Sequence, residues 1–314
     1  MEYSSLADSG IKVSRLSLGC WQLGGQGWGR VSEKEMVEAI IRAMDKGINL
    51  FDTAPIYGLG HSEEVLGRIL HKRRREIVIA TKVGLTWANR ADFKKSIDCS
   101  PENINREIEA SLKRLKTDYI DIYQIHWPDP DTPIEDTIDA MERLKTAGKI
   151  RLIGCCNFPL ALLKRALKAG RVDSVQIPYN LIDRQVEKGI LPFCRQNNIA
   201  VLTYSSIARG LLSGKYDKDV KFGLNDHRGS SRDGYFSSEV LSRNLEVAER
   251  VKAIAKRLDK TPVQVALRWL LDKDCVTSAI FGAKNVTQLE ENVAASGFTL
   301  SREDIEFLNI EEKR

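Results

Sequence analysis

Short apolar runs alternate along the chain with longer stretches in which apolar residues recur every three or four positions. The short runs are typical of buried strands and the longer stretches of amphipathic helices. Eight strands are predicted, at Leu16–Cys20, Ile48–Asp52, Ile77–Thr81, Tyr119–Ile125, Ile150–Gly154, Ser174–Ile177, Ile199–Tyr204 and Val276–Ile280. Strict alternation of strands and helices predicts a parallel sheet in the α/β class, and eight such units predict one closed (β/α)8 (TIM) barrel.

Cap and stop residues mark the ends of several predicted helices. Ser32, with Glu35 three residues later, is typical of a helix start, and Gly47 is typical of a helix stop. Three further helices are predicted to begin where a capping hydroxyl precedes a proline, at Ser100-Pro101, Thr132-Pro133 and Thr261-Pro262.

Two segments depart from the alternation. Tyr3–Val13 is predicted to form a hairpin over the barrel floor. Lys215–Ser238, which follows the seventh strand, is rich in Gly, Ser and charged residues and is too long for an ordinary connection. We expect a mobile flap over a ligand there, with disordered decoration as the alternative. Since no linker is visible, residues 1–314 are expected to form one domain.

Composition limits the class of protein. The chain has 314 residues, of which 42% are hydrophobic and 29% charged, as in ordinary globular proteins. No apolar run is long enough to span a membrane, and the first residues lack the features of a secretory signal, so a cytoplasmic protein is expected. The net charge of +5 is modest. The basic run His71–Arg75 is expected to be a solvated loop, so nucleic-acid binding is not expected.

The cysteine pattern does not indicate a metal site. No Cys-x-x-Cys pair occurs, and no histidine lies at metal-ligand spacing from a cysteine. In a cytoplasmic protein we expect reduced and mostly buried cysteines. The six are Cys20, Cys99, Cys155, Cys156, Cys194 and Cys275.

The glycine-rich segment Gly24–Gly29, which follows the first strand, partly resembles a dinucleotide-binding fingerprint. However, Arg30 occupies the third glycine position, and the next helix has its own cap at Ser32. We therefore expect a flexible loop on the active face of the barrel and no Rossmann domain.

Four polar residues follow buried strands. Asp52, Lys82 and His126 lie at the ends of the second, third and fourth strands, and Tyr57 follows Asp52 by five residues. Each alone could be structural, as an ion pair, a packed aromatic or a core histidine. However, the carboxyl ends of barrel strands meet on one face, where catalytic residues gather. Together the four therefore indicate an active site.

These residue types suit proton transfer at a carbonyl. Asp52 and Lys82 should pair, because each is costly to bury alone. The Lys82 ammonium is expected to lower the pKa of Tyr57 from about 10. Such a phenol can protonate a forming alkoxide, while His126 donates a hydrogen bond to the carbonyl oxygen. Because no nucleophile–base pair is visible, acyl transfer is disfavoured, and the hydride must come from a cofactor.

At these residues the chain resembles the aldo-keto reductase superfamily, from about residue 10 to the C-terminus. The resemblance lies in segments 49–58, 81–84 and 124–128, and later motifs resemble the bacterial and potassium-channel-β-like branch. It implies a (β/α)8 barrel that binds NADPH in an extended form. It also implies that Tyr57 is the proton donor, that Lys82 and Asp52 tune it, and that His126 orients the substrate.

The resemblance also implies a cofactor site, with NADPH preferred and NADH possible. Tyr204 would stack on the nicotinamide, and Lys284, with Gln288 close by, would contact the 2′-phosphate. Cys156 stands where the family commonly has serine, and Ser206 where proline is common. The expected cofactor residues are Trp21, Asp52, Cys156, Asn157, Gln176, Tyr204, Ser205, Ser206, Ala208, Arg209, Gly210, Leu211, Ser213, Lys215, Gly282, Lys284, Gln288, Glu291 and Asn292.

Three tryptophans follow strand ends on the active face. Trp21, Trp87 and Trp127 are expected to form an aromatic substrate pocket with Tyr57 and His126, although core packing would also explain each tryptophan. The expected function is NADPH-dependent reduction of aldehydes or ketones by a monomer or weak homo-oligomer. A sugar or polyol dehydrogenase and a nicotinamide-binding regulatory subunit are the alternatives.

Overall fold

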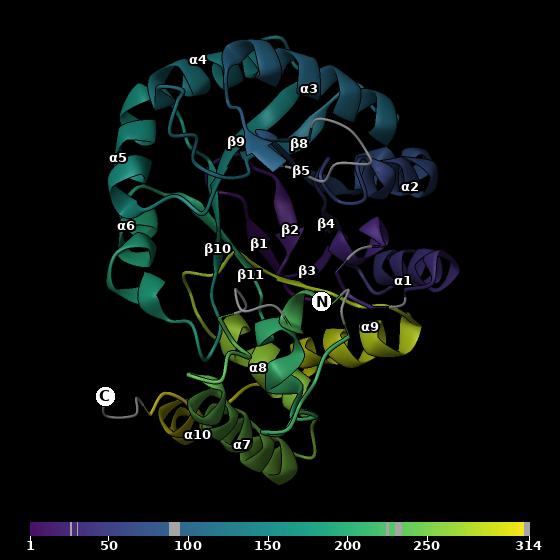
Figure 1. Cartoon of the computed structure of the whole chain (residues 1–314), viewed down its shortest axis with the longest axis vertical. Coiled ribbons are helices and arrows are strands. Elements are labelled where there is room, and N and C mark those ends of the chain that lie inside the picture. The colour runs from purple at the N-terminus through teal and green to yellow at the C-terminus, as the bar shows by residue number, and fades with distance from the viewer. Residues whose placement is uncertain (26, 30, 88–94, 224–225, 230–233, 311–314) are drawn as a thin grey trace.

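The computed structural model describes residues 1–25, 27–29, 31–87, 95–223, 226–229 and 234–310. Eight parallel strands close into a barrel (Figure 1), as predicted. They are β3 (Leu16–Gly19), β4 (Leu50–Asp52), β5 (Val78–Val83), β8 (Ile120–Ile125), β9 (Ile150–Cys156), β10 (Ser174–Pro178), β11 (Ala200–Tyr204) and β12 (Ser278–Phe281). The barrel closes where β12 pairs with β3, with Ile280 opposite Ser17.

Helices surround the barrel on its outer side (Figure 1). The α-helices are α1 (Glu33–Asp45), α2 (His61–Leu70), α3 (Pro101–Leu115), α4 (Ile134–Thr146), α5 (Leu160–Ala169), α6 (Ile190–Gln196), α7 (Leu241–Leu258), α8 (Pro262–Leu271), α9 (Val286–Val293) and α10 (Arg302–Leu308). Short 3-10 turns lie between them, at η1 (Trp21–Gly24), η2 (His71–Glu76), η3 (Gln185–Lys188), η4 (Ala208–Ser213), η5 (His227–Gly229) and η6 (Ala294–Gly297).

Three of the four predicted helix caps are confirmed. Ser32, Ser100 and Thr261 each accept a hydrogen bond from a backbone N–H in the first turn of the helix that follows. The prediction for Thr132 is wrong, because Pro133 is the N-cap of α4. The Thr132 hydroxyl donates instead to the carboxylate of Asp129, at 2.8 Å.

The barrel interior has an apolar lower part, closed by the predicted N-terminal hairpin. Strands β1 (Tyr3–Ser5) and β2 (Lys12–Ser14) pair in antiparallel fashion. Leu6 and Val13, both fully buried, belong to one apolar cluster with inward side chains of the barrel. Those side chains are Leu50, Val78, Ala80, Ile122, Leu152, Ala200, Leu202 and Ile280. This cluster supports the polar residues one layer above it, nearer the carboxyl ends of the strands.

A second hairpin was not predicted. Strands β6 (Leu85–Trp87) and β7 (Lys95–Ile97) pair in antiparallel fashion directly after β5. The hydroxyls of Thr86 and Ser96 lie 2.6 Å apart across the pair. Trp87 therefore belongs to a hairpin strand and does not simply follow a barrel strand.

The run His71–Arg75 is largely solvent-exposed, as expected, but it is a 3-10 turn and one of its residues, Arg74, is tied to the barrel. These residues form the turn η2, and only 11% of the Arg74 side chain is exposed. Arg74 pairs with the buried Asp121 at 2.6 Å and lies 4.0 Å above the ring of Tyr119. The sequence pattern could not show this partner, because Asp121 lies on a neighbouring strand.

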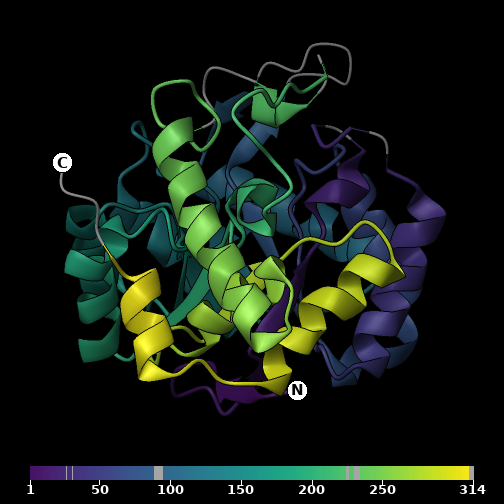
Figure 2. The same cartoon turned by 90° about the horizontal axis from the view of Figure 1, so that it is seen from below.

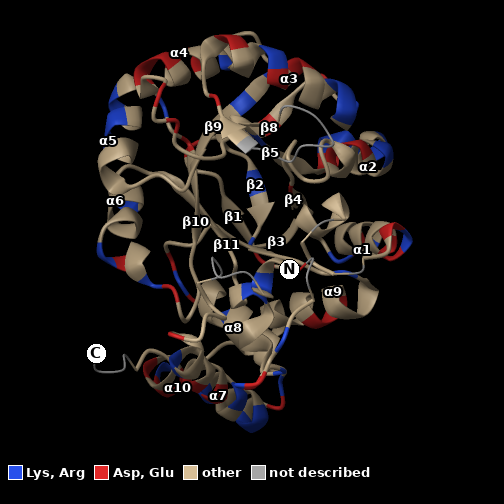
Figure 3. Ribbon diagram, viewed as in Figure 1, with Lys and Arg blue, Asp and Glu red and all other residues tan. Residues whose placement is uncertain are grey.

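Basic and acidic residues alternate over the outer helices and gather on no single one of them in the view of Figure 3. Within the described residues, none of the helices combines the length and apolarity needed to cross a membrane. All six cysteines are free thiols, five of them buried and Cys275 partly buried. In the same part of the chain, no group of His, Cys, Asp or Glu side chains could hold a metal ion.

Candidate active site

Asp52 and Lys82 form a buried ion pair at the carboxyl ends of β4 and β5. Lys82 Nζ donates to both carboxylate oxygens of Asp52, at 2.9 and 2.8 Å, and to the backbone oxygen of Thr53, at 2.9 Å. Only 4% of Asp52 and 1% of Lys82 is exposed. Burial acts against the ammonium, but Asp52 raises the pKa of Lys82. Lys82 therefore stays charged at neutral pH.

Tyr57 lies in the turn after β4, where its hydroxyl accepts a hydrogen bond from Lys82 Nζ at 3.4 Å. The pKa of this phenol differs from the sequence-based expectation. Burial raises the pKa of Tyr57 to about 12, although the nearby Lys82 acts to lower it. The expected depression is wrong because the cost of burying a phenolate exceeds the attraction of one ammonium that Asp52 already holds.

Two aromatic side chains flank Tyr57. The ring of His126 lies 6.1 Å away and nearly perpendicular to it, and the indole of Trp21 is stacked on it at 5.9 Å. The four residues singled out in the sequence thus lie together, with Lys82 between Asp52 and Tyr57. Trp87 lies in β6 and Trp127 is 41% exposed; within the described residues neither makes a ring contact with Tyr57.

Two buried glutamines extend this cluster. Gln176 Nε2 donates to Asp52 Oδ1 at 2.7 Å, and Gln124 Nε2 donates to the same oxygen at 3.4 Å. Sequence reasoning assigned Gln176 to the cofactor and missed Gln124. The signal was available, because Gln124 lies two residues before His126 at the end of β8, and alternate residues of an extended segment face the same side.

Residues at the ends of β9 and β11 lie beside this layer. Asn157, at a positive φ of 61°, donates to the backbone oxygen of His126 at 3.0 Å and accepts from the Tyr204 hydroxyl at 2.8 Å. Cys156 Sγ lies 3.7 Å from Gln124 Oε1, its acceptor. Burial raises the pKa of Cys156, so its thiol is neutral.

The loop after β11 has an unusual backbone. Ser205, Ala208, Arg209 and Gly210 all have positive φ, of 53°, 48°, 53° and 97°. This conformation strains non-glycine residues and is common where a backbone is shaped for a ligand. Successive N–H groups in such a loop form a concavity for an anion. The Ser206 hydroxyl bonds instead to the backbone oxygen of Ile280, at 2.7 Å.

The rest of this loop packs on itself. Leu211 is fully buried. The Ser213 hydroxyl donates to the backbone oxygen of Gly210 at 2.6 Å, and Lys215 Nζ lies 5.0 Å from the ring of Tyr216.

The segment after β12 lies next to the glycine-rich loop. Lys284 Nζ donates to the backbone oxygen of Trp28 at 2.5 Å, and the Lys284 N–H donates to Gln288 Oε1 at 2.9 Å. Asn285 caps α9 through the backbone N–H of Gln288. Asn292 Nδ2 donates to the backbone oxygen of Gly282, at 3.2 Å. The backbone oxygen of Glu291 accepts from Gln264.

The glycine-rich loop and the long loop after β11 meet over the barrel mouth, and we call this contact the clasp. It consists of Gly27 and Trp28 on one side and Asp226 and His227 on the other, joined by β-bridges and by a bond from His227 N to Gly27 O, at 3.0 Å. The imidazole of His227 lies 5.3 Å from the indole of Trp21. In Figure 2 the loop carrying the short turn His227–Gly229 lies at one end of the barrel. The sequence predicted a flap in the loop after β11, but not its contact with the glycine-rich loop. The mobility of this flap stays a prediction.

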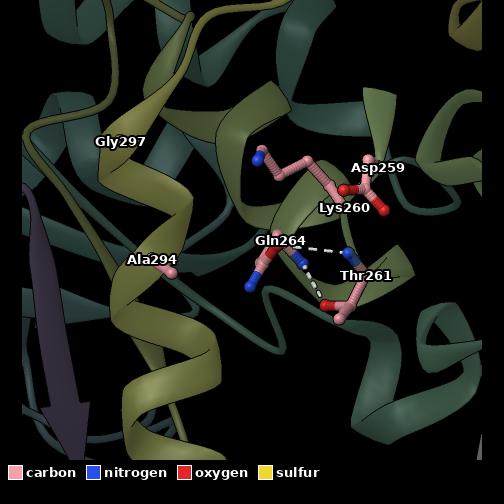
Figure 4. Close-up of a pocket in the computed structure, with 6 residues that line it drawn as sticks. All are labelled: Asp259, Lys260, Thr261, Gln264, Ala294 and Gly297. Carbon is pink, nitrogen blue, oxygen red and sulfur yellow. Dashed lines mark hydrogen bonds between the residues drawn. The ribbon is translucent and has the colours of Figure 1, made fainter. Parts of the chain in front are cut away.

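Two further cavities lie away from the cluster around Asp52, Lys82 and Tyr57. One of about 400 Å³ lies between the end of α7 and the start of α8, where the bonds between Thr261 and Gln264 form a helix cap (Figure 4). Another, of about 710 Å³, lies beside the loop 128–134 on the outer side of β8.

The chain matches the aldo/keto reductase family over residues 15–311. It is 41% identical to aldo-keto reductase YhdN of Bacillus subtilis, over 98% of this chain and 93% of the relative. It is 35% identical to an NADH-specific methylglyoxal reductase of Escherichia coli, over 97% of this chain and 96% of the relative. The solved structure of a glycerol dehydrogenase from Gluconobacter oxydans superimposes with a TM-score of 0.88 at 35% identity, over 96% of this chain and 93% of that one.

These matches cover almost the whole chain, and the barrel is the fold they share. The chain therefore belongs to the aldo/keto reductase family and is an NAD(P)H-dependent oxidoreductase of small carbonyl compounds.

Proposed function

We propose that this enzyme reduces aldehydes or ketones with NADPH and that Tyr57 is the general acid. The observation that carries the proposal is the position of Lys82 Nζ, which bonds to both Asp52 and the hydroxyl of Tyr57. The bound cofactor supplies the hydride that attacks the carbonyl carbon. Tyr57 gives its proton to the oxygen as negative charge develops there.

The other residues of the cluster support this proton transfer. Lys82, held charged by Asp52, stabilises the phenolate left on Tyr57. His126, whose ring lies beside that of Tyr57, orients the carbonyl oxygen. Because the pKa of Tyr57 is about 12, the phenol carries its proton at neutral pH and is ready to act as an acid.

The described residues fit an extended nicotinamide dinucleotide. The loop 205–210, in which four residues have positive φ, would offer N–H groups to a pyrophosphate, and Tyr204 would offer a ring to the nicotinamide. Asn157, Gln176 and Cys156 would contact the carboxamide. We assign the 2′-phosphate to Lys284, which lies at the start of α9. This ammonium supports a preference for NADPH, while NADH, the cofactor for which the Escherichia coli relative is specific, is the alternative.

Oxidation of a polyol is the second candidate. The structural relative from Gluconobacter oxydans is a glycerol dehydrogenase and shares the barrel over 96% of this chain. The same residues would then act in reverse, with the phenolate of Tyr57 taking the proton of an alcohol.

Replacing Tyr57 by Phe tests the proposed acid. The variant should lose most of its turnover, by about 10²-fold or more, because general acid catalysis typically contributes that much. NADPH binding, measured by quenching of intrinsic fluorescence, should change little. Turnover is followed as loss of reduced-nicotinamide absorbance with a panel of aldehydes and ketones.

Tyr123→Phe is the matched control. Tyr123 is another buried tyrosine, and in the described part of the structure its hydroxyl has no hydrogen-bond partner. This variant should keep full turnover. Wild-type rates in Tyr57→Phe would show that Tyr57 is not the acid.

A further inference from the structure

The hydrogen bonds around Asp52 include an arrangement of two glutamine amides that the proposed reaction does not use directly. A primary amide has two N–H groups and one oxygen. Gln176 Nε2 donates to Asp52 Oδ1 at 2.7 Å and to Gln124 Oε1 at 3.5 Å. Both N–H groups of Gln176 are therefore directed into the protein. Its oxygen is left to accept from a donor outside this cluster.

Gln124 closes the arrangement into a triangle. Its Nε2 donates to Asp52 Oδ1 at 3.4 Å, while its oxygen accepts from Gln176 and from Cys156 Sγ. One hydrogen bond would fix only the position of the Gln176 nitrogen, and the amide plane could still turn about it. The second contact, to Gln124, fixes the plane and so the direction of the Gln176 oxygen.

The strand next to Gln124 is shaped to receive it. Gly154 lies beside Gln124 on β9, and a Cβ at that position would lie 2.7 Å from Gln124 Cγ and 2.8 Å from Ser174 Oγ. Only a residue without a side chain leaves this space. Gln124 is itself fully buried, so its amide is held in one place by packing as well as by hydrogen bonds.

We propose that Gln124 is a positioning residue: by bridging Asp52 and Gln176, it aims the oxygen of Gln176 at the carboxamide NH₂ group of the nicotinamide. The inference rests on the proposed cofactor site. It adds that the direction of one recognition group depends on a residue that does not touch the cofactor. The same amide also donates to Asp52 and so links carboxamide recognition to the ion pair of Lys82.

Binding of NADP⁺ is compared with binding of its 3-acetylpyridine analogue, in which a methyl ketone replaces the carboxamide and removes the NH₂ donor. Both dissociation constants are measured by fluorescence titration, without turnover. The wild-type enzyme should prefer NADP⁺. In Gln124→Met, which keeps the side-chain length without its amide, this preference should fall about two- to tenfold, the range that one neutral hydrogen bond provides.

Two further variants complete the test. Gly154→Ala should lower the preference in the same way, because its new methyl group displaces Gln124, and it serves if Gln124→Met does not fold. The double variant should add little, since both changes act on the same contact. Tyr123 lies on the same strand as Gln124, but its side chain packs among other apolar residues, away from Asp52 and Gln176. Tyr123→Phe should therefore leave the preference for NADP⁺ unchanged.

An unchanged preference in a folded Gln124→Met or Gly154→Ala variant would overturn the inference while leaving the proposed reaction intact. Equal binding of both compounds by the wild-type enzyme would also overturn it. Failure of the proposed function looks different: the wild-type enzyme would then bind neither NADP⁺ nor NADPH, or would bind them without turning over any carbonyl compound.

Discussion

Lys82 contacts both of the other ionisable groups at the centre of the site, Asp52 and Tyr57. Its Nζ contacts Asp52, Thr53 and Tyr57 within 3.4 Å, and Lys82, Asp52 and Thr53 are buried. The ammonium cannot be removed without leaving Asp52 as a buried, unpaired carboxylate, which is costly. In the proposed mechanism Lys82 therefore serves both the stability of the barrel mouth and the acidity of Tyr57.

The raised pKa of Tyr57 predicts how the reverse reaction depends on pH. In the proposed mechanism, alcohol oxidation needs the phenolate of Tyr57. Because the pKa of Tyr57 is about 12, the phenolate fraction rises about tenfold with each pH unit below that value. The rate of oxidation should therefore keep rising between pH 7 and 10. Carbonyl reduction needs the protonated phenol and should not lose its acid over this range.

Measuring kcat/KM in both directions across that pH range, with an alcohol and its carbonyl partner, checks this prediction. A plateau of the oxidation rate near neutral pH would mean that the group has a much lower pKa in the working enzyme.

Lys284→Ala tests whether Lys284 contacts the 2′-phosphate of NADPH, as proposed. Loss of a charged contact to phosphate should weaken NADPH binding by about tenfold or more, while NADH, which has no such phosphate, should bind nearly as before. Both dissociation constants come from fluorescence titration. Equal weakening of the two cofactors would show that Lys284 acts instead through its bond to the Trp28 backbone.

The sequence predicted which residues cluster in the site, but it did not predict the pKa of Tyr57. Asp52 ends β4, Lys82 is the penultimate residue of β5 and His126 directly follows β8, so the barrel topology alone places them on one face. The pKa of Tyr57 depends on how far neighbouring segments exclude water, and no local pattern encodes this. The spacing of Gln124 from His126 indicated which way it faces, but not its hydrogen bonds to Asp52 and Gln176, which lie on other strands.

At the scale of elements, the clasp is the contact that spans the mouth of the site. Asp226 pairs with Arg228 at 2.5 Å, and Arg228 in turn donates to the Tyr216 hydroxyl at 2.6 Å, so this side of the clasp is braced internally. Its other side depends on Gly27, whose φ of +79° favours glycine. A Cβ there would lie 1.9 Å from the ring of His227.

Gly27→Ala should therefore open the clasp and speed release of NADPH. Both the backbone strain and the collision with His227 act in the same direction. We expect a dissociation rate several-fold above that of the wild-type enzyme, measured by stopped-flow displacement of bound NADPH.

Gly25→Ala is the matched control for the clasp. Gly25 also has a positive φ, of +68°, but a Cβ there would meet no atom within 4 Å. Gly25→Ala therefore shows the effect of backbone strain on NADPH release without a collision. Equal release rates in the two variants would show that the contact with His227 does not retain the cofactor.

Elements with long and regular patterns were predictable, and short ones were not. All eight barrel strands coincide with predicted apolar runs, because buried strands need continuous apolar residues. The hairpin strands Leu85–Trp87 and Lys95–Ile97 have only three residues each and include polar ones, so they give no such signal. The cap expected at Thr132 is absent because α4 begins after Pro133, so Thr132 lies one residue before the cap position, and its hydroxyl donates to Asp129.

At the scale of the whole molecule, the barrel is apolar at its floor and polar at its mouth. The N-terminal hairpin completes the apolar part by inserting Leu6 and Val13 beneath the strands. The two ends should therefore be separable in experiments, because changes at the floor alter stability without touching the cofactor site.

Leu6→Ala should destabilise the protein by about 2–5 kcal/mol, the usual cost of such a cavity, with NADPH affinity preserved. Urea unfolding followed by fluorescence and circular dichroism measures the loss. Ile11→Ala, which truncates a partly buried residue against the same cluster, should cost less. A similar small loss in both variants would mean that the hairpin does not hold the floor closed.

The pairing of β12 with β3 has a consequence for synthesis on the ribosome. Ser17 is synthesised well before its partner Ile280, which lies far downstream in the chain. At about 5–20 residues per second, roughly 13–53 s pass between the synthesis of the two residues. During that time β3 has a free edge, and the floor hairpin has only part of its apolar support. The nascent chain thus exposes a strand edge that the finished, closed barrel covers.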